Sequence, residues 1–142
     1  MQSQSFSNHV RVHPLYHYFA VPVSLALIPL SLINVFINFG LPSIILFVAM
    51  IMLHLAIFLA RDYAKKNQDR IIRAELRMRY YQLTQQPLEE IEARLSVAQL
   101  LALRFASDEE FIELLRNPGT AEKKPDEIKK QIIQWNADWM RV

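Results

Sequence analysis

Histidine is the residue type in this sequence whose chemistry admits the most alternatives. His54 lies among apolar residues, six positions before the end of a long stretch without charged residues. An ionisable residue inside a membrane-spanning segment is by default a candidate functional residue. A neutral imidazole there could ligate the iron of haem or the magnesium of chlorophyll. It could equally form a hydrogen bond with Ser24, with Ser31 or with a carbonyl freed by a proline. His17 is a second candidate ligand, and the sequence leaves these alternatives open.

Catalytic and metal-binding motifs find little support elsewhere in the chain. There is no cysteine, which excludes thiolate metal sites and cysteine nucleophiles. Only Gly40 and Gly119 are glycines, so a glycine-rich phosphate loop is excluded. The acidic clusters at 89–92 and 108–110 fall where helices are expected to begin, and carboxylates there offset the helix dipole. We therefore expect no enzyme activity, no metal site, no required cofactor and no small-molecule substrate.

Four basic residues recur at helical spacing after the uncharged stretch: Lys66, Arg70, Arg73 and Arg77. Beside a membrane, such a basic face attracts anionic lipids. Acidic residues precede some of them by four positions, and pairs of this kind stabilise an exposed helix. The face is therefore either a contact for lipid or an acidic partner, or a solvated surface paired with itself. The interleaved acidic residues argue against nucleic acid as a partner.

Two further sets of residues indicate packing surfaces. A polar stripe runs along the first apolar segment at helical spacing: Ser24, Ser31, Asn34 and Asn38. Polar groups in lipid tend to face another helix, which here is either the second apolar segment or a partner subunit. An apolar stripe follows near the C-terminus: Ile128, Ile132, Trp135 and Trp139. This stripe predicts a helix that either packs on the helix over 61–83 or lies at the membrane surface with its tryptophans at headgroup depth.

The elements that position these residues follow from the distribution of charge. From residue 12 to residue 60 there is no Lys, Arg, Asp or Glu, a length suited to two membrane crossings. We expect spanning helices over 15–37 and 43–60, joined by a turn at 38–42. Seven basic residues follow within 61–79, against the single basic residue of the N-terminal tail, residues 1–14. The positive-inside rule places both termini in the cytoplasm.

The remainder of the chain predicts a small cytoplasmic helical region over residues 61–142. The second spanning helix has no breaker after it and continues to about residue 83, with an apolar stripe formed by Ile72, Leu76, Tyr80 and Leu83. Capping signals and prolines then predict four shorter helices, at 87–95, 97–106, 108–116 and 125–138. The expected fold class is all-α: an integral membrane hairpin of two helices whose second helix extends into this region.

Several separated segments resemble a family of small bacterial membrane proteins, the domain-of-unknown-function family 6526. They are Asn8-His9-Val10-Arg11 with His13-Pro14, the run from Gln68 to Arg73, the run from Leu101 to Asp108, and Ile128-Lys129-Lys130 with Trp135, Asp138, Arg141 and Val142. The resemblance spans nearly the whole chain and implies a two-helix protein of the bacterial inner membrane. It implies no activity and no ligand residues, and His54 is not among its residues.

Three functions are expected on these grounds. The first is an accessory, non-catalytic subunit that binds other integral-membrane subunits, with an electron-transport or photosynthetic assembly as the most plausible host. The second is a subunit that ligates haem or chlorophyll through His54. The third is a homo-oligomer that binds anionic lipids through the basic face that begins at Lys66.

Overall fold

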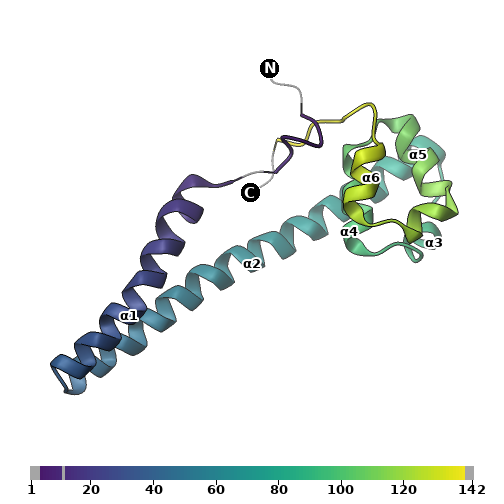
Figure 1. Ribbon diagram of the computed structural model, residues 1–142. Coiled ribbons are helices and arrows are strands. Elements are labelled where there is room, and N and C mark those ends of the chain that lie inside the picture. Colours follow the sequence, from purple (N-terminus) through teal and green to yellow (C-terminus); the bar gives the residue numbers. More distant parts are fainter. Residues whose placement is uncertain (1–3, 11, 140–142) are drawn as a thin grey trace. The chain divides into compact units, whose positions relative to one another are not determined.

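The computed structural model describes residues 4–10 and 12–139, and within them every regular element is a helix (Figure 1). The predicted all-α class is confirmed for this part of the chain. Of the residues on which the family resemblance rests, Arg11, Arg141 and Val142 lie outside it.

The chain divides into two compact units. The first, here called the hairpin unit, comprises residues 12–65. The second, here called the helical unit, comprises residues 4–10 together with residues 66–139. Each is described by itself below.

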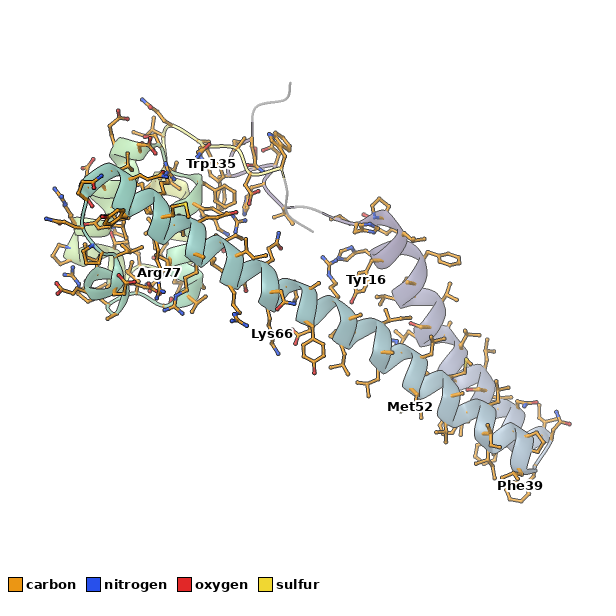
Figure 2. The ribbon with its side chains drawn as sticks, turned by 180° about the vertical axis from the view of Figure 1, so that it is seen from behind. Tyr16, Phe39, Met52, Lys66, Arg77 and Trp135 are labelled. Carbon is orange, nitrogen blue, oxygen red and sulfur yellow. The ribbon has the colours of Figure 1, made fainter. Side chains whose placement is uncertain are left out.

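The hairpin unit consists of two helical segments that lie side by side (Figures 1 and 2). The first opens as a π-helix, η1 (Leu15–Ala20), and continues as α1 (Val21–Ile37). Pro14 stands at the start, and Pro22 falls in the first turn of α1. Proline is tolerated at position 14 because the first amides of a helix have no partner within it. Pro22 lies inside the continuous helical segment, where it removes one backbone amide donor. Both elements together cover the range 15–37 predicted for the first apolar helix.

The second helix of the hairpin, α2 (Leu41–Thr84), starts earlier than predicted. The turn therefore covers residues 38–40 rather than 38–42. The Ser43 hydroxyl donates to the carbonyls of Asn38 and Gly40, each at 2.8 Å, and so satisfies acceptors at the junction. Pro42 does not break the helix because it lies in the first turn. Phe39 marks the tip of the hairpin in Figure 2.

Helix α2 is 44 residues long and runs without interruption through the ranges predicted separately as 43–60 and 61–83. The segment Leu15–Ile37 and helix α2 are both long and apolar enough to cross a membrane. Only 11% of the apolar window in the first, and 6% of that in the second, is buried within the protein. Both therefore differ from the core helix of a soluble domain, which is mostly buried.

The helical unit surrounds the last turns of α2 with short helices (Figure 1). Ile72, Leu76 and Tyr80 are buried as their spacing predicted, whereas Leu83 is exposed. The following elements are α3 (Glu89–Glu92), α4 (Val97–Ala102), η2 (Leu103–Phe105), α5 (Asp108–Arg116), η3 (Pro118–Glu122) and α6 (Pro125–Gln131). The predicted range 108–116 agrees with α5, while the predicted helix 87–95 is reduced to α3.

The predicted helix 125–138 is wrong beyond Gln131. Helix α6 ends there, and Ile132 has an extended backbone. Residues 133–136 instead pair with the chain around α5: the Glu110 carboxylate accepts the amides of Ile133 and Gln134, and Trp135 forms a β bridge with Ala106. These tertiary hydrogen bonds replace the helical ones.

The N-terminal residues 4–10 belong to the helical unit rather than to a separate irregular tail. Gln4 is buried and exchanges two hydrogen bonds with the backbone of Asp138, at 3.2 and 2.8 Å. His9 is also buried and lies against the rings of Phe105 and Trp135. The two segments that flank the hairpin in sequence therefore pack into one core.

Candidate functional site

The polar contact at the centre of the hairpin joins His54 of α2 to Ser24 of α1. The Ser24 hydroxyl lies 2.9 Å from Nδ1 of His54 and 3.1 Å from the carbonyl of Val21. Ser24 is buried and His54 is half-buried, with the ring of Phe58 at 6.2 Å. This is one of the hydrogen bonds that the sequence predicted for His54.

The number of available protons links the two hydrogen bonds of Ser24 to the tautomer of His54. A serine hydroxyl has one hydrogen, and a carbonyl can only accept. If the hydroxyl donates to Val21, Nδ1 of His54 must donate to the hydroxyl. In that tautomer the lone pair lies on Nε2, the nitrogen that remains available to another partner. The contact thus fits both interpretations of His54, and the two are compatible.

The rest of the predicted polar stripe does not act as one group. Ser31 is buried, and its hydroxyl donates within its own helix to the carbonyl of Ile28 at 2.8 Å. Asn38 donates from its amide to the side-chain oxygen of Asn34 at 2.9 Å and is exposed. Ser24 is therefore the member of the stripe that forms a side-chain hydrogen bond to α2.

A cleft of about 330 Å³ opens at the end of the hairpin away from its turn. It is lined by Tyr16, His17, Val21, Phe58, Arg61, Asp62 and Lys65. The guanidinium carbon of Arg61 stands 4.5 Å from the centre of the Tyr16 ring. The second predicted ligand, His17, points one ring nitrogen, Nδ1, at the carbonyl of His13, at 3.0 Å. Figure 2 shows Tyr16 on the first helix, close to the face of α2.

Two members of the predicted basic face contact a buried acid instead of a partner surface. Arg73 and Arg77, one turn apart on α2, both donate from Nε to the carboxylate of Glu92. The contact from Arg77 measures 2.7 Å. Glu92 is 5% exposed, whereas Lys66 and Arg70 remain exposed. The predicted face is therefore divided between an internal ion pair and two surface cations.

The environment of Glu92 keeps its carboxyl ionised. Burial acts to raise the pKa, but the hydrogen bonds and charges of Arg77 and Arg73 outweigh burial and hold the pKa of Glu92 below its ordinary value. The same contact raises the pKa of Arg77. A buried carboxylate held by two guanidinium groups is an arrangement that joins α3 to α2, and it leaves the carboxylate little capacity to act as a base.

The two predicted tryptophans differ in their surroundings. Trp135 is half-buried, with its ring 4.8 Å from that of Phe105 and 5.8 Å from that of His9. Trp139 is exposed and lines a cleft with Ile72 and Leu76 of α2. The predicted packing of the C-terminal stripe near α2 is therefore present, but without the helix that was expected to carry it.

Sequence reasoning missed the contacts of His9 and the cleft beside Arg61. His9 lies with Nδ1 2.7 Å from the Phe6 carbonyl and Nε2 3.3 Å from Nζ of Lys129. No local pattern reveals a contact across 120 positions. The cleft did have a signal: Arg61 and Lys65 are four positions apart at the end of the uncharged stretch, and an aromatic cluster begins at Tyr16.

The described residues contain no group of three His, Asp or Glu side chains placed to hold a metal ion. Comparison with known proteins gives one result. A family model described as a family of unknown function (DUF6526) matches residues 1–142. No curated protein and no solved structure matches the chain.

Proposed function

The chain belongs to this family of unknown function, and we propose that it is a membrane-embedded, non-catalytic accessory subunit of a larger assembly in the bacterial inner membrane. The observation that carries the proposal is the exposure of the hairpin: 11% of one apolar window and 6% of the other are buried. Soluble monomers rarely expose apolar patches beyond a few hundred Å². Lipid tails or apolar partner helices are the surroundings that suit such a surface.

The composition of the helical unit supports a hairpin with both ends on one side. Residues 4–10 precede the first apolar helix, and residues 66–139 follow the second, yet both belong to one unit. Two crossings return the chain to its starting side, which is what this shared core requires. The dense positive charge of residues 61–79 then favours the cytoplasm as that side.

An exposed apolar stripe on the helical unit supports a protein partner. Ile71, Met78 and Tyr81 of α2 are 59%, 64% and 54% exposed. Their spacing of seven and three positions places them along one side of the helix, distinct from the buried Ile72 and Leu76. Enrichment of methionine and tyrosine is characteristic of protein interfaces. We name Ile71, Met78 and Tyr81 the partner stripe.

Membrane insertion is tested by extraction and by labelling. The wild-type protein should stay in the membrane during alkaline carbonate washing. Since the chain has no cysteine, a single introduced cysteine is the only thiol that a maleimide can label. Ser7→Cys and Gln134→Cys should react with a membrane-impermeant maleimide from one face of sealed vesicles. Phe39→Cys should react from the other face. Release by carbonate, or reaction of Ser7→Cys and Gln134→Cys from opposite faces, would refute the membrane hairpin.

Membership of an assembly is tested by native purification in mild detergent. The wild-type protein should migrate with other integral-membrane subunits, and their identification tests the electron-transport or photosynthetic host expected from the sequence. Met78→Glu should release it from them, while Ala98→Glu, the same added charge at an exposed position of α4, should not. Migration of the wild-type protein alone at its own mass would refute the subunit role.

Ligation of haem or chlorophyll through His54 is a second candidate, favoured by the hydrogen bond that directs Nδ1 to Ser24. In that role Nε2 would bind the metal, and Ser24 would hold the orientation of the ring. The absorption spectrum of the protein purified from its native membrane tests this. A pigment band that disappears in His54→Ala supports ligation, and the absence of such a band from the wild-type protein excludes it.

A further inference from the structure

The cleft beside Arg61 has the chemistry of a phosphate site next to an apolar surface. Two cations on α2, Arg61 and Lys65, line it four positions apart, so they lie one above the other on the helix. Val21 and Phe58 supply apolar walls. The cleft lies where the uncharged stretch ends and charge begins, since Arg61 is the first charged residue after 49 uncharged ones.

The cations of this cleft differ from the five cations of the helical unit that bind carboxylates. Arg73, Arg77, Arg79, Arg104 and Lys129 each form a salt bridge with a carboxylate. Within the described residues no such salt bridge is found for Arg61 or Lys65. Asp62 also lines the cleft and offsets one positive charge, so the three side chains together keep a net positive charge.

The position of Arg61 suits a phosphate. Its guanidinium lies over the Tyr16 ring, with 4.5 Å from the central carbon to the ring centre. A guanidinium carries its N–H donors in a planar fork, and a ring contact of this kind leaves donors for a ligand. Such a fork matches two phosphate oxygens, and an ammonium such as that of Lys65 adds a point charge.

We propose that this cleft binds one anionic phospholipid, with the phosphate between Arg61 and Lys65 and the start of an acyl chain along Val21 and Phe58. The inference rests on the proposed membrane hairpin, because it requires the cleft to lie at headgroup depth. The apolar walls favour a lipid over a free phosphate compound, since a soluble ligand gains nothing from the adjacent exposed apolar helices. Tyr16 belongs to the same site as the platform for Arg61, and aromatic rings of this kind are enriched at that depth.

The test uses the full chain in nanodiscs made of one part phosphatidylglycerol and nine parts phosphatidylcholine. After release into mild detergent, native mass spectrometry measures how much protein retains one phosphatidylglycerol. The variant Arg61→Gln with Lys65→Gln should lower retention roughly thirtyfold, because each cation near anionic lipid contributes about fivefold. Lys65→Gln alone should lower lipid retention about fivefold. Because Lys65 is exposed, this variant leaves the contact between Arg61 and Tyr16 intact.

The matched control is Lys66→Gln with Arg70→Gln, which removes two exposed cations from the same helix. Retention close to wild type supports a defined cleft, whereas a loss as large as that of the Arg61 and Lys65 variant would overturn it in favour of diffuse attraction. Millimolar glycerol phosphate should not displace the lipid, and displacement would overturn the choice of a lipid ligand. Carbonate extraction of every variant separates the two proposals, since loss of lipid retention in protein that stays in the membrane concerns the cleft alone.

Discussion

Glu92 is a residue whose charge contributes directly to the fold. Its carboxylate is 5% exposed and receives Arg73 and Arg77 from successive turns of α2. We expect Glu92→Gln to lower the free energy of unfolding of the helical unit by about 1–3 kcal/mol, because the two guanidinium groups lose a charged acceptor. Both tryptophans of the chain lie in this unit, so denaturation in detergent followed by tryptophan fluorescence measures it. Glu90→Gln, an exposed neighbour on α3, is the control and should change stability little.

The same contact predicts how stability depends on pH. The folded protein holds the pKa of Glu92 below its ordinary value near 4.5, so the stabilisation is complete above that value and is lost as the pH falls through the lower, folded-state pKa. The wild-type unit should therefore lose stability on acidification below about pH 4.5 more steeply than Glu92→Gln does. If the free energy of unfolding fell equally steeply with pH in the two proteins, other carboxyl groups would govern the acid transition.

Ser24 determines the environment of His54. In Ser24→Ala the Nδ1 nitrogen of His54 loses its hydrogen-bond partner at 2.9 Å. We expect this to lower the free energy of unfolding of the hairpin by about 0.5–2 kcal/mol. Unfolding with increasing mole fraction of dodecyl sulfate, followed by circular dichroism, measures the change. Ser31→Ala is the matched control, because that hydroxyl bonds within its own helix. In a double-mutant cycle with His54→Ala, a coupling energy near zero would argue against the contact.

At the scale of the element, the end of α2 stores strain at one residue. Gln85 follows the helix with a φ of 56°, in the left-handed region, where its amide bonds back to the carbonyl of Tyr81 at 2.8 Å. Glycine reaches this conformation without the steric cost of a Cβ atom. The Cβ atom costs about 1–2 kcal/mol in the left-handed region, and the greater freedom of glycine in the unfolded chain offsets about 0.5–1 kcal/mol of that gain. We therefore expect Gln85→Gly to stabilise the helical unit by about 0.5–1 kcal/mol, measured by the same fluorescence assay. Gln85→Val should destabilise it, and a stabilising valine would contradict the argument.

The extended segment after α6 provides a second prediction at this scale. Trp135 packs on Phe105 and lies beside the bridge to Ala106, so Trp135→Ala should destabilise the helical unit by about 2–4 kcal/mol. Trp139 is exposed, and Trp139→Ala should cost less than about 1 kcal/mol. The amides of Ser107 and Asn136 bond to the carbonyls of Gln134 and Phe105. Hydrogen exchange at these two amides measures the effect of each substitution. Comparable effects of the two substitutions would contradict the conclusion that Trp135 is packed and Trp139 is exposed.

These elements also show what local sequence could and could not predict. The apolar spacing of Ile72, Leu76 and Tyr80 and the cap at Ser96 are local signals, and the structure has both. Helix α6 is shorter than its pattern because the carboxylate of Glu110, 23 and 24 positions away, accepts two amides that a longer helix would have used. In the candidate site, His54 and Ser24 were predicted together, whereas the partner of Arg73 and Arg77 was not, since Glu92 lies outside their helix.

At the scale of the whole molecule, the N-terminal residues are part of the core that the C-terminal residues form. His9 packs against both Phe105 and Trp135, and Gln4 bonds to Asp138. We expect deletion of residues 1–10 to destabilise the helical unit by about 2–4 kcal/mol, since it uncovers a packed aromatic cluster. Faster hydrogen exchange at residues 132–138 would report the loss. The milder Gln4→Ala should accelerate exchange at Asp138, whose amide bonds to the Gln4 side chain, and unchanged exchange in both would contradict this packing.

The contact between Gln4 and Asp138 has a consequence for the order of events on the ribosome. Its partners are 134 positions apart, so Gln4 cannot form this contact until Asp138 has been translated. The two apolar helices lie between them in the sequence, so they emerge while residues 4–10 still lack their partner. Synthesis of the segment that ends at Asp138, rather than the emergence of the hairpin, is therefore the step that allows the helical unit to be completed.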